Sequence, residues 1–441
     1  MRILTRFLAL LLLLALPLSA ADLPVLSLSD ALAAAEENNI SLEEARVSLS
    51  QVLRNQRNVM STFMPTLSVS AGLSPSWTLP LPDIDAGYDG LSLSAGASAS
   101  FTFTGSMLRD KQERTLAKEA ANLSYLSSHE SITSSVTTAY WQIAVLQATV
   151  DAAATSLDDA YNSYVSVYES YESGQTDELT LYQTELSWNQ AEYTLQSAKD
   201  SLVLALQAFR NMTGIEGDFQ LESIDDDFTM ALPTAEELFS EYAQSTLTVR
   251  AARNSLAQAD LDVTTTKLSA YVPSLSTGLS YSYAGGWNTD WDYDHNSHKL
   301  TGSVTVTVPV SSMIPGGSGN TAVKDAKDAK TLASLSLRET EDDLLESIRS
   351  AITTIEQAQD NRAITEKTLK NAKRSYELSE EAFEAGLLSA DDLSSARNSY
   401  LSAETSCISL SASHLIACYD LATTLNTSFE ELKTKYSTET I

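Results

Sequence analysis

The residues best suited to metal or acid–base chemistry are few and lie far apart along the chain. Its four histidines are His129, His295, His298 and His414. Only His295 and His298 stand close together, three residues apart, and no third ligand accompanies them at the spacing that a zinc site needs. His129 and His414 stand alone in helical stretches, where a solvated or packed imidazole is the simpler interpretation. The sequence therefore predicts no metal site on histidine.

Acidic residues alternate in one segment and resemble a calcium loop only in part. They are Asp290, Asp292 and Asp294. The glycine and the distal glutamate of an EF-hand are missing, so we interpret the segment as an acidic, solvated loop. The glycine-rich segment 316–319 lacks the lysine of a phosphate-binding loop, and neither a nucleophile elbow nor a dinucleotide fingerprint occurs. We therefore expect neither an enzyme nor a cofactor.

Acidic residues also stand at two expected helix starts. Asp177 follows Gly174, and Asp391 and Asp392 follow Gly386, each time where a helix is expected to begin. Carboxylates at a helix start complement the helix dipole. The residues alone therefore indicate a helix-start role.

Composition excludes several classes of function. The chain has 441 residues and a formal net charge of −30, from 28 basic and 58 acidic residues. Nucleic-acid binding needs a cationic surface, so no nucleic acid is expected as a partner. The two cysteines, Cys407 and Cys418, lie eleven residues apart on one predicted helix. That spacing separates them by about 16 Å, too far for a disulfide.

The N-terminus has the features of a secretory signal peptide. Arg2 and Arg6 precede an apolar run over residues 7–18, and small residues follow at Ala20 and Ala21. The run is too short to span a membrane, so we assign residues 1–21 to a signal peptide that is cleaved after Ala20 or Ala21. No later segment is apolar enough to be a membrane helix. A mature chain that enters a membrane must then do so as a closed β-barrel.

The chain repeats itself once. Residues 65–68, Pro-Thr-Leu-Ser, return as Pro-Ser-Leu-Ser at 273–276, and Tyr-Glu-Ser-Gly at 171–174 returns as Phe-Glu-Ala-Gly at 383–386. We therefore expect two similar halves, at 22–222 and 223–432, followed by a C-terminal tail at 433–441. The division falls near an aspartate-rich stretch at 225–227.

Each half predicts the same order of elements: a helix, two strands, a very long helix and a further helix. In the first half, a helix starts near Ser29 and runs towards Ser61. Strict alternation predicts strands at 66–74, 91–104, 274–283 and 299–310, joined in pairs by polar and aromatic loops at 74–90 and 285–298. Strands of this length and alternation suit a barrel with one face on lipid and the other on water.

Apolar residues in the long helices recur at spacings of four and three. The run extends from Ile132 to Tyr171, and a second begins at Leu344. A sustained period of 3.5 predicts supercoiled packing of helices. A helix over 106–172 would span about 100 Å. Gly174 and Gly386 end these helices as C′ glycines do, which gives two helical hairpins with tight tips. Four strands cannot close a barrel, so several copies must associate.

At this point the chain resembles the outer-membrane efflux protein family, the TolC-like channel-tunnels. The resemblance lies in the order and spacing of weak motifs over the whole mature chain. They are Leu-Ser-Leu-Ser-Asp-Ala-Leu at 26–32, Pro-Thr-Leu-Ser at 65–68, Val-Pro-Val at 308–310 and Tyr-Glu-Leu-Ser at 376–379 before the second tip.

The resemblance implies a mainly α fold with a β-barrel portion. Long antiparallel coiled-coil hairpins form a periplasmic α-barrel, and four strands from each protomer of a homotrimer share a twelve-stranded barrel in outer-membrane lipid. The family passes substrates unchanged from an inner-membrane pump, of the RND or ABC type, through a periplasmic adaptor into the tunnel. It implies adaptor docking at the tips, at Gly174, Gly386 and Leu387.

The resemblance also implies a periplasmic gate at the second tip. The family often has acidic pore residues six and nine positions after the tip glycine. Here these positions hold Asp392 and Ser395, and Asp391 is adjacent. Three copies of Asp391 and Asp392 near one narrow axis would attract cations, repel anions and raise each other's pKa values. Some members lock the gate with an arginine where this chain has Leu388, so another contact must hold it. Two rivals remain: a duct for type I protein secretion, and a secreted coiled-coil structural protein without a pore.

Overall fold

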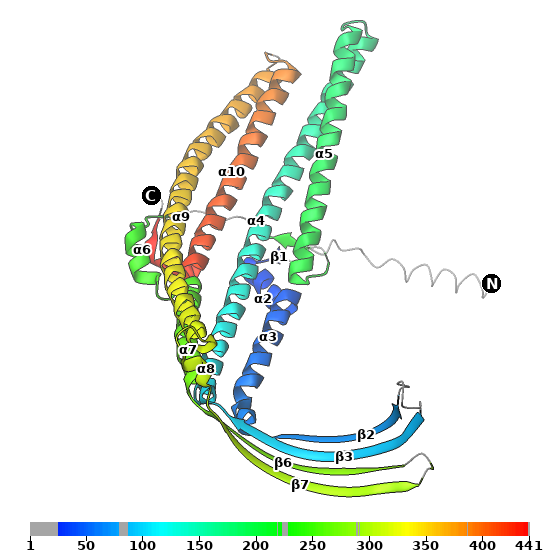
Figure 1. Ribbon diagram of the computed structural model, residues 1–441. Helices are drawn as coiled ribbons and strands as arrows, with labels where there is room; N and C mark the ends of the chain where they lie inside the picture. The colour runs from blue at the N-terminus through cyan, green and yellow to red at the C-terminus, as the bar shows by residue number, and fades with distance from the viewer. Residues whose placement is uncertain are drawn as a thin grey trace, which may run out of the picture. The chain divides into compact units, whose positions relative to one another are not determined.

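The computed structural model describes residues 25–78, 87–217, 219–222, 228–287, 290, 292–385 and 387–439. The predicted signal peptide at 1–21 and the aspartate-rich stretch at 225–227 lie outside these residues. The described residues form two compact units, one within 25–43, 129–235 and 347–439 and the other within 44–128 and 236–346. Two long helices, α4 (Asp110–Glu172) and α9 (Ser318–Glu384), contribute to both units (Figure 1).

The second unit contains a four-stranded antiparallel sheet in the order β2-β3-β6-β7. Its strands are β2 (Thr66–Thr78), β3 (Gly87–Phe103), β6 (Ser274–Trp287) and β7 (Tyr293–Thr307). The strands extend further into the expected loops than alternation predicted, so the loop bounds 74–90 and 285–298 were wrong. Pairing continues there across register shifts at Ser76/Trp77 and Gly285/Gly286. At its other end β7 stops at Thr307, before Pro309, which cannot donate to the ladder.

The two faces of this sheet differ in chemistry, since one is mainly apolar and the other mainly carries hydroxyls. The register places apolar residues of the four strands side by side in rows across one face. One such row is Val69, Ala97, Tyr281 and Leu300. The opposite face aligns hydroxyls and glycine, for example the row Ser68, Ser98, Ser280 and Thr301. Side-chain oxygens of Ser68 and Ser98 lie 2.7 Å apart on that face. The predicted alternation is therefore confirmed as one apolar and one hydroxyl-lined face.

Helices α3 (Ile40–Arg57) and α7 (Leu247–Tyr271) lead into the sheet together with the start of α4. Short 3-10 helices, η1 (Asn58–Phe63) and η2 (Gly105–Arg109), make the transitions. Arg114 secures one of them, because its guanidinium contacts Asp110 Oδ2 at 2.8 Å, the Asn55 carbonyl at 2.6 Å and Thr62 Oγ1 at 3.0 Å. The long helix therefore starts at Asp110, four residues later than the predicted start at 106.

The predicted helix from Ser29 towards Ser61 is interrupted, and in this respect the prediction was wrong. The structure has α2 (Leu28–Asn38), capped by Ser27, and then α3. Asn39 between them is extended, and its Oδ1 accepts hydrogen bonds from the N–H groups of Ser41 and Leu42. An asparagine side chain that caps a new helix competes with continuation of the old one.

The first unit is built on two helical hairpins. The first joins α4 to α5 (Glu178–Thr213), and the second joins α9 to α10 (Ala390–Leu425). Smaller elements complete the two units: β1 (Val25–Leu26), β4 (Gln220–Leu221), β5 (Phe228–Met230), α6 (Ala235–Tyr242), α8 (Val310–Met313), α11 (Phe429–Tyr436) and β8 (Ser437–Glu439). β1 pairs with β4 in parallel, and β5 pairs with β8 antiparallel, so the expected tail at 433–441 contributes a strand.

Contacts within the first unit fix the order α9, α10, α4, α5, which Figure 1 also shows. Tyr376 of α9 stacks on Tyr400 of α10 with ring centroids 5.9 Å apart. Tyr164 of α4 stacks on Trp188 of α5 at 5.2 Å. Helices α10 and α4 are joined by an ion pair that is described below.

The predicted apolar period accounts for the core between these helices. Heptad positions such as Val136, Ile143, Ile348 and Ile355 are fully buried. Among the described residues, no helix combines the length and apolar character that a membrane span requires. Over the same residues, no group of three or more His, Cys, Asp or Glu side chains is arranged to hold a metal ion. Neither cysteine takes part in a disulfide.

Candidate functional site at the hairpin tips

The first tip is a tight reversal that depends on Gly174. This residue has φ +74°, a conformation that favours glycine. Its N–H bonds the Tyr171 carbonyl at 2.9 Å, and the N–H of Gln175 bonds the Ser170 carbonyl at 2.8 Å. This pair of hydrogen bonds is the Schellman motif, which satisfies carbonyls at the end of α4. The predicted C′ role of Gly174 is confirmed.

The second tip has the same hydrogen bond one repeat later. The N–H of Leu387 bonds the Ala382 carbonyl at 2.9 Å, as that of Gln175 bonds Ser170 at 2.8 Å. Leu387 is 82% exposed, so an apolar side chain stands at the very end of the hairpin. Gly386 itself lies outside the described residues. Leu388 is part of the turn.

After each tip, a hydroxyl and a carboxylate three residues apart cap the next helix. At α5, Asp177 Oδ1 accepts from the N–H of Thr180 at 2.8 Å and from its hydroxyl at 2.6 Å. At α10 the roles are exchanged, because Ser389 Oγ accepts from the N–H of Asp392 at 3.2 Å and donates to its carboxylate at 2.7 Å. The hydrogen bonds from Thr180, first from its hydroxyl and then from its backbone, lower the pKa of Asp177.

The predicted gate residues therefore sit in the first turn of α10. The Asp392 side chain is exposed and bonded to the cap, which is the helix-start role that the sequence allowed. The backbone of Asp391 belongs to the same turn. Ser395 stands one turn after Asp392 and lines the groove described below. A role of Asp391 and Asp392 in a pore stays a prediction.

An ion pair that sequence reasoning missed joins the two hairpins. Arg397 Nη1 of α10 lies 2.5 Å from Asp159 Oδ1 of α4. The Asp159 side chain is 11% exposed, and its Oδ2 is buried without a described hydrogen-bond partner. Burial raises the pKa of Asp159, while the positive charge of Arg397 opposes that rise. The two residues are 238 positions apart in the sequence. In the sequence, each of them looks like an ordinary charged residue on a helix surface.

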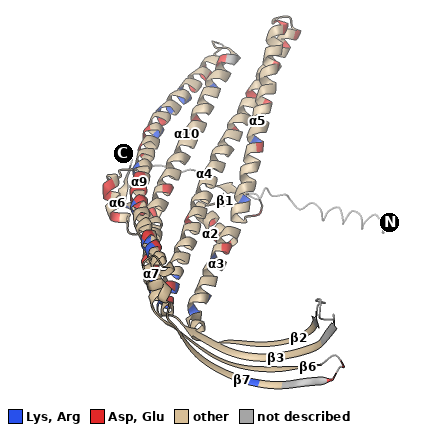
Figure 2. Ribbon diagram, in the orientation of Figure 1, with Lys and Arg blue, Asp and Glu red and all other residues tan. Residues whose placement is uncertain are grey.

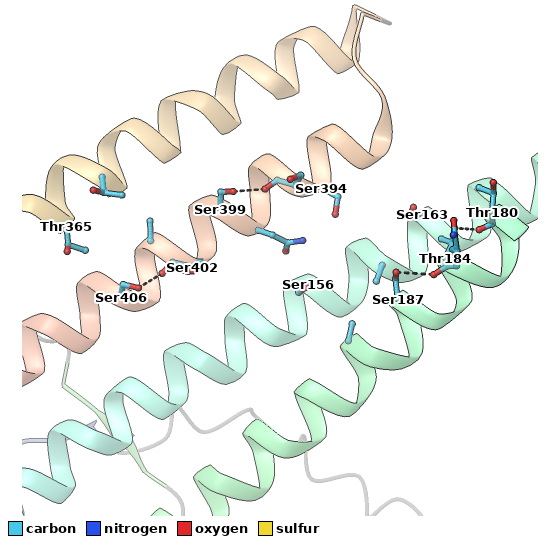
Figure 3. A pocket seen from close by; sticks show the side chains of 17 residues that line it. Ser156, Ser163, Thr180, Thr184, Ser187, Thr365, Ser394, Ser399, Ser402 and Ser406 are labelled. Carbon is cyan, nitrogen blue, oxygen red and sulfur yellow. Dashed lines mark hydrogen bonds between the residues drawn. The ribbon is translucent and has the colours of Figure 1, made fainter.

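A groove runs beside this ion pair along the four helices (Figure 3). Its volume is about 1020 Å³, and all its lining residues are Ser, Thr, Ala, Asn or Gln. Among them are Ser156 of α4, Thr184 of α5, Thr365 of α9 and Ser399 of α10. None of these side chains is charged, and most are small. The groove lining is therefore polar and hydrated, without a charged or large apolar side chain that could bind a ligand tightly.

Charged residues are rare in the sheet, as they are absent from the groove lining. Figure 2 shows that charged residues concentrate on the helices and hardly occur on the strands. Over the strand segments 66–76, 92–103, 274–287 and 297–307, Lys299 is the one Lys, Arg, Asp or Glu. It belongs to the hydroxyl-lined face, opposite Ser282.

Comparisons with known proteins agree with this architecture. The family model described as outer membrane efflux protein matches residues 31–215 and 238–427. No curated protein sequence matches the chain significantly.

Solved structures share the fold at low sequence identity. The outer membrane channel CmeC of Campylobacter jejuni is 18% identical, with a TM-score of 0.68 over 92% of this chain and 88% of its own. The open-state outer membrane channel MtrE of Neisseria gonorrhoeae is 18% identical, with a TM-score of 0.68 over 91% and 89%. The outer membrane protein VceC of Vibrio cholerae is 17% identical, with a TM-score of 0.63 over 91% and 96%. Because the family model covers most of its length, the chain belongs to the outer membrane efflux protein family, a family of channels and not of enzymes.

Proposed function

We propose that this protein is one protomer of a passive, trimeric exit duct that crosses the outer membrane and continues through the periplasm. The two-faced sheet is the observation that supports this most strongly. A sheet with an apolar face and a hydroxyl-lined face, both in register over four strands, matches the wall of a water-filled barrel in lipid.

The edges of this sheet require further copies. β2 and β7 are its outer strands, and an unpaired strand edge cannot face hydrocarbon. Pairing β7 of one copy with β2 of the next closes the barrel. Three copies give twelve strands, and this count comes from the family resemblance. The shared barrel is therefore formed only in the assembled protein.

The helical hairpins form the periplasmic part of the proposed duct. α4 has 63 residues, which corresponds to about 95 Å of helix. The neutral groove along the four helices and the hydroxyl face of the sheet both suit a wall along which solutes pass without binding tightly. Substrates then move unchanged, driven by a pump of the RND or ABC type in the inner membrane.

The tips are the proposed contact with a periplasmic adaptor and the proposed gate. Gly174, Gly386 and Leu387 would form the docking surface, and the exposed Leu387 offers it an apolar anchor. Asp391 and Asp392 would ring the constriction, since Asp392 precedes the groove-lining Ser395 by one turn. With Leu388 in place of an arginine, the Arg397–Asp159 pair is the contact that would hold the hairpins together.

Single-channel recording in a planar bilayer, on the detergent-purified mature chain, tests this proposal. We expect small, cation-selective current steps that change on mild acidification, because crowded carboxylates at the constriction take up protons. Protein that is shown to be helical and folded, yet neither inserts nor conducts, would contradict the duct. Insertion without current would indicate closed tips, and a tip-loosened variant must then conduct.

A further inference from the structure

The segments that join the sheet to its helices have a charge balance unlike that of the rest of the chain. The twelve residues next to each strand, at 54–65, 104–115, 262–273 and 308–319, include six basic and three acidic residues. The whole chain has 28 basic and 58 acidic residues, so its excess of acid is reversed here. These four segments form the collar of the sheet, and all of them belong to the second unit. The basic residues of the collar are Arg54, Arg57, Arg109, Lys111, Arg114 and Lys267.

The collar also exposes large apolar side chains. Met60 and Met64 precede the outer strand β2, and Met313 and Ile314 follow the outer strand β7, where neighbouring copies meet in the proposed ring. Leu108 instead adjoins the inner strand β3 and is 64% exposed. Pairing of copies at the outer strands therefore leaves it uncovered. Basic residues beside exposed apolar ones are typical of a surface that lies at a membrane interface.

A second groove, the collar groove, lies between the start of α4 and helix α7, which adjoin the two inner strands. Its volume is about 700 Å³. Its lining includes the basic Arg109 and Lys111 and the apolar Leu116 and Leu261. The two walls are fixed to each other, because Asn254 Nδ2 of α7 donates a hydrogen bond to the Leu116 carbonyl of α4 at 3.0 Å. The groove therefore combines a basic and an apolar lining on a rigid frame.

The positive charge of the collar groove is not neutralised within the protomer. Arg109 Nη1 donates to Gln112 Oε1 at 3.0 Å, a neutral partner that leaves further N–H donors of the guanidinium available. Over the part of the chain that the structure describes, neither Arg109 nor Lys111 forms an ion pair. Asp260 also lines the groove, but its Oδ1 is already paired with Lys330 Nζ at 2.5 Å. The lining therefore has a net positive charge and room for an anionic group.

The acidic residues that neighbour Arg109 and Lys111 in the sequence do not belong to this lining. They are Asp110 and Glu113. The Asp110 carboxylate accepts hydrogen bonds from Arg114 at 2.8 Å and from the Thr62 hydroxyl at 3.1 Å, so it is held beside η1. The two basic side chains of the groove are therefore available to a ligand.

We propose that the collar groove binds the headgroup of an anionic phospholipid, in the leaflet on the helix side of the barrel. Arg109 and Lys111 pair with the lipid phosphate, and the amide of Gln112 adds N–H donors. Long basic side chains suit this level, because their stems pack on apolar surface while their charges stay among the headgroups. The acyl chains lie against Leu108 and the apolar face of the sheet.

Three observations identify a lipid as the occupant of the collar groove. The groove adjoins inner strands, whereas neighbouring copies meet at the outer strands β2 and β7. The apolar face of the sheet extends to Phe103, which is paired with Leu275 and lies six residues before Arg109. The positive charge of the groove complements a phosphate. The inference rests on the proposed barrel and adds the lipid chemistry that this barrel recognises.

Native mass spectrometry of the detergent-purified protein, titrated with lipid, tests the collar groove. The probes are phosphatidylglycerol and phosphatidylcholine with the same acyl chains, because both contain a phosphate and only the first has a net negative charge. We expect phosphatidylglycerol to stay bound at concentrations where phosphatidylcholine does not. Inorganic phosphate, which has the charge without the acyl chains, should not displace it.

Matched variants separate the collar groove from a general attraction between charges. Arg109→Gln/Lys111→Gln should weaken the binding of phosphatidylglycerol about tenfold to thirtyfold, because two charges near an anionic lipid are lost. Arg109→Lys/Lys111→Arg, which keeps both charges, should retain most of the binding and guards against a variant that simply misfolds. Lys367→Gln/Lys370→Gln removes the same charge from exposed positions of the first unit and should bind as the wild type does.

Several results would overturn the lipid site. Equal weakening in the two glutamine variants would show that net charge alone retains the lipid. A protein that conducts in bilayers but binds both lipids equally would exclude the headgroup site and leave the duct intact. A changed oligomeric state with unchanged lipid binding would assign the groove to a contact between copies. A wild-type protein that neither binds lipid, inserts nor conducts would contradict the proposed function as well.

Discussion

Asp392 performs a capping role that any test of its charge must preserve. Its carboxylate accepts a hydrogen bond from the hydroxyl of Ser389. At the first tip, the carboxylate of Asp177 accepts one from the hydroxyl of Thr180. A substitution that disturbs the cap would alter the tip whether or not the residue lines a pore. The repeat supplies a solution, because either tip can be converted to the same Ser-x-x-Thr cap by one change.

We expect Asp392→Thr to reduce cation selectivity, and Asp177→Ser to leave it unchanged. Each variant removes one carboxylate per protomer and retains a hydroxyl that caps the helix. Each should therefore cost a similar, small stability of about 0.5–1 kcal/mol. Reversal potentials in a salt gradient, recorded beside thermal unfolding, provide the readout. Equal selectivity in the two variants would place Asp392 outside the constriction and leave it the helix-start role alone.

The ion pair between Asp159 and Arg397 joins helix α4 of the first hairpin to helix α10 of the second. Its loss should therefore weaken the packing of the two hairpins against each other. Arg397→Leu leaves a carboxylate that is only 11% exposed without its cation. We expect a loss of about 2 kcal/mol at neutral pH, less than the 3–5 kcal/mol of a fully buried pair because Arg397 is 36% exposed. The double variant Asp159→Asn/Arg397→Leu should recover most of it.

The loss should also depend on pH in a defined direction. Burial already raises the pKa of Asp159, and removing Arg397 raises it further. A raised folded-state pKa means that the penalty is present at high pH and fades as the carboxyl takes up a proton. Unfolding temperatures of Arg397→Leu should therefore approach those of the wild type on acidification. An unchanged gap between pH 7.5 and pH 4.5 would show that the destabilisation comes from lost packing.

Glu130 on α4 gives the hairpin a second pH dependence. Burial raises the pKa of its carboxyl to about 7 from 4.5. Since the folded-state value is the higher one, its contribution to stability is fully present below about pH 4.5 and is lost as pH rises through 7. Glu130→Gln, which stays neutral, should be more stable than the wild type at pH 8 and should differ little at pH 4.5. Thermal unfolding at both values checks this; parallel curves would argue against a buried carboxylate.

Sequence patterns predicted the elements well where the pattern was long. Five heptads from Ile132 predicted α4, and alternation predicted four strands with the correct faces. The predicted helix was wrong at Asn39, because the Asn39 side chain caps a new helix. The predicted strand ends were wrong because pairing continues through bulges. The Asp159–Arg397 pair could not be predicted, because no local pattern relates residues 238 positions apart. The division into repeats at 22–222 and 223–432 stays a prediction.

At the scale of the whole molecule, the assignment of lipid and water to the two sheet faces decides whether a barrel can form. Ser303 and Val304 are neighbours on β7 and point to opposite faces. Ser303 stands opposite Gly278 on the hydroxyl face and is exposed. Val304 is 75% exposed on the apolar face, opposite Thr277.

We expect Val304→Arg to block membrane insertion and Ser303→Arg to permit it. An arginine on the lipid face of a barrel is destabilising, by about 2–4 kcal/mol at the bilayer midplane and by less towards the interfaces, and each of three copies would add this cost. An arginine on the hydroxyl face stays in water and should shift selectivity towards anions instead. Folding into lipid vesicles, followed by heat-resistant oligomers on gels, separates the two outcomes. Equal insertion of both variants would mean that the apolar face does not meet lipid, and the proposed barrel would then be wrong whatever the helices do.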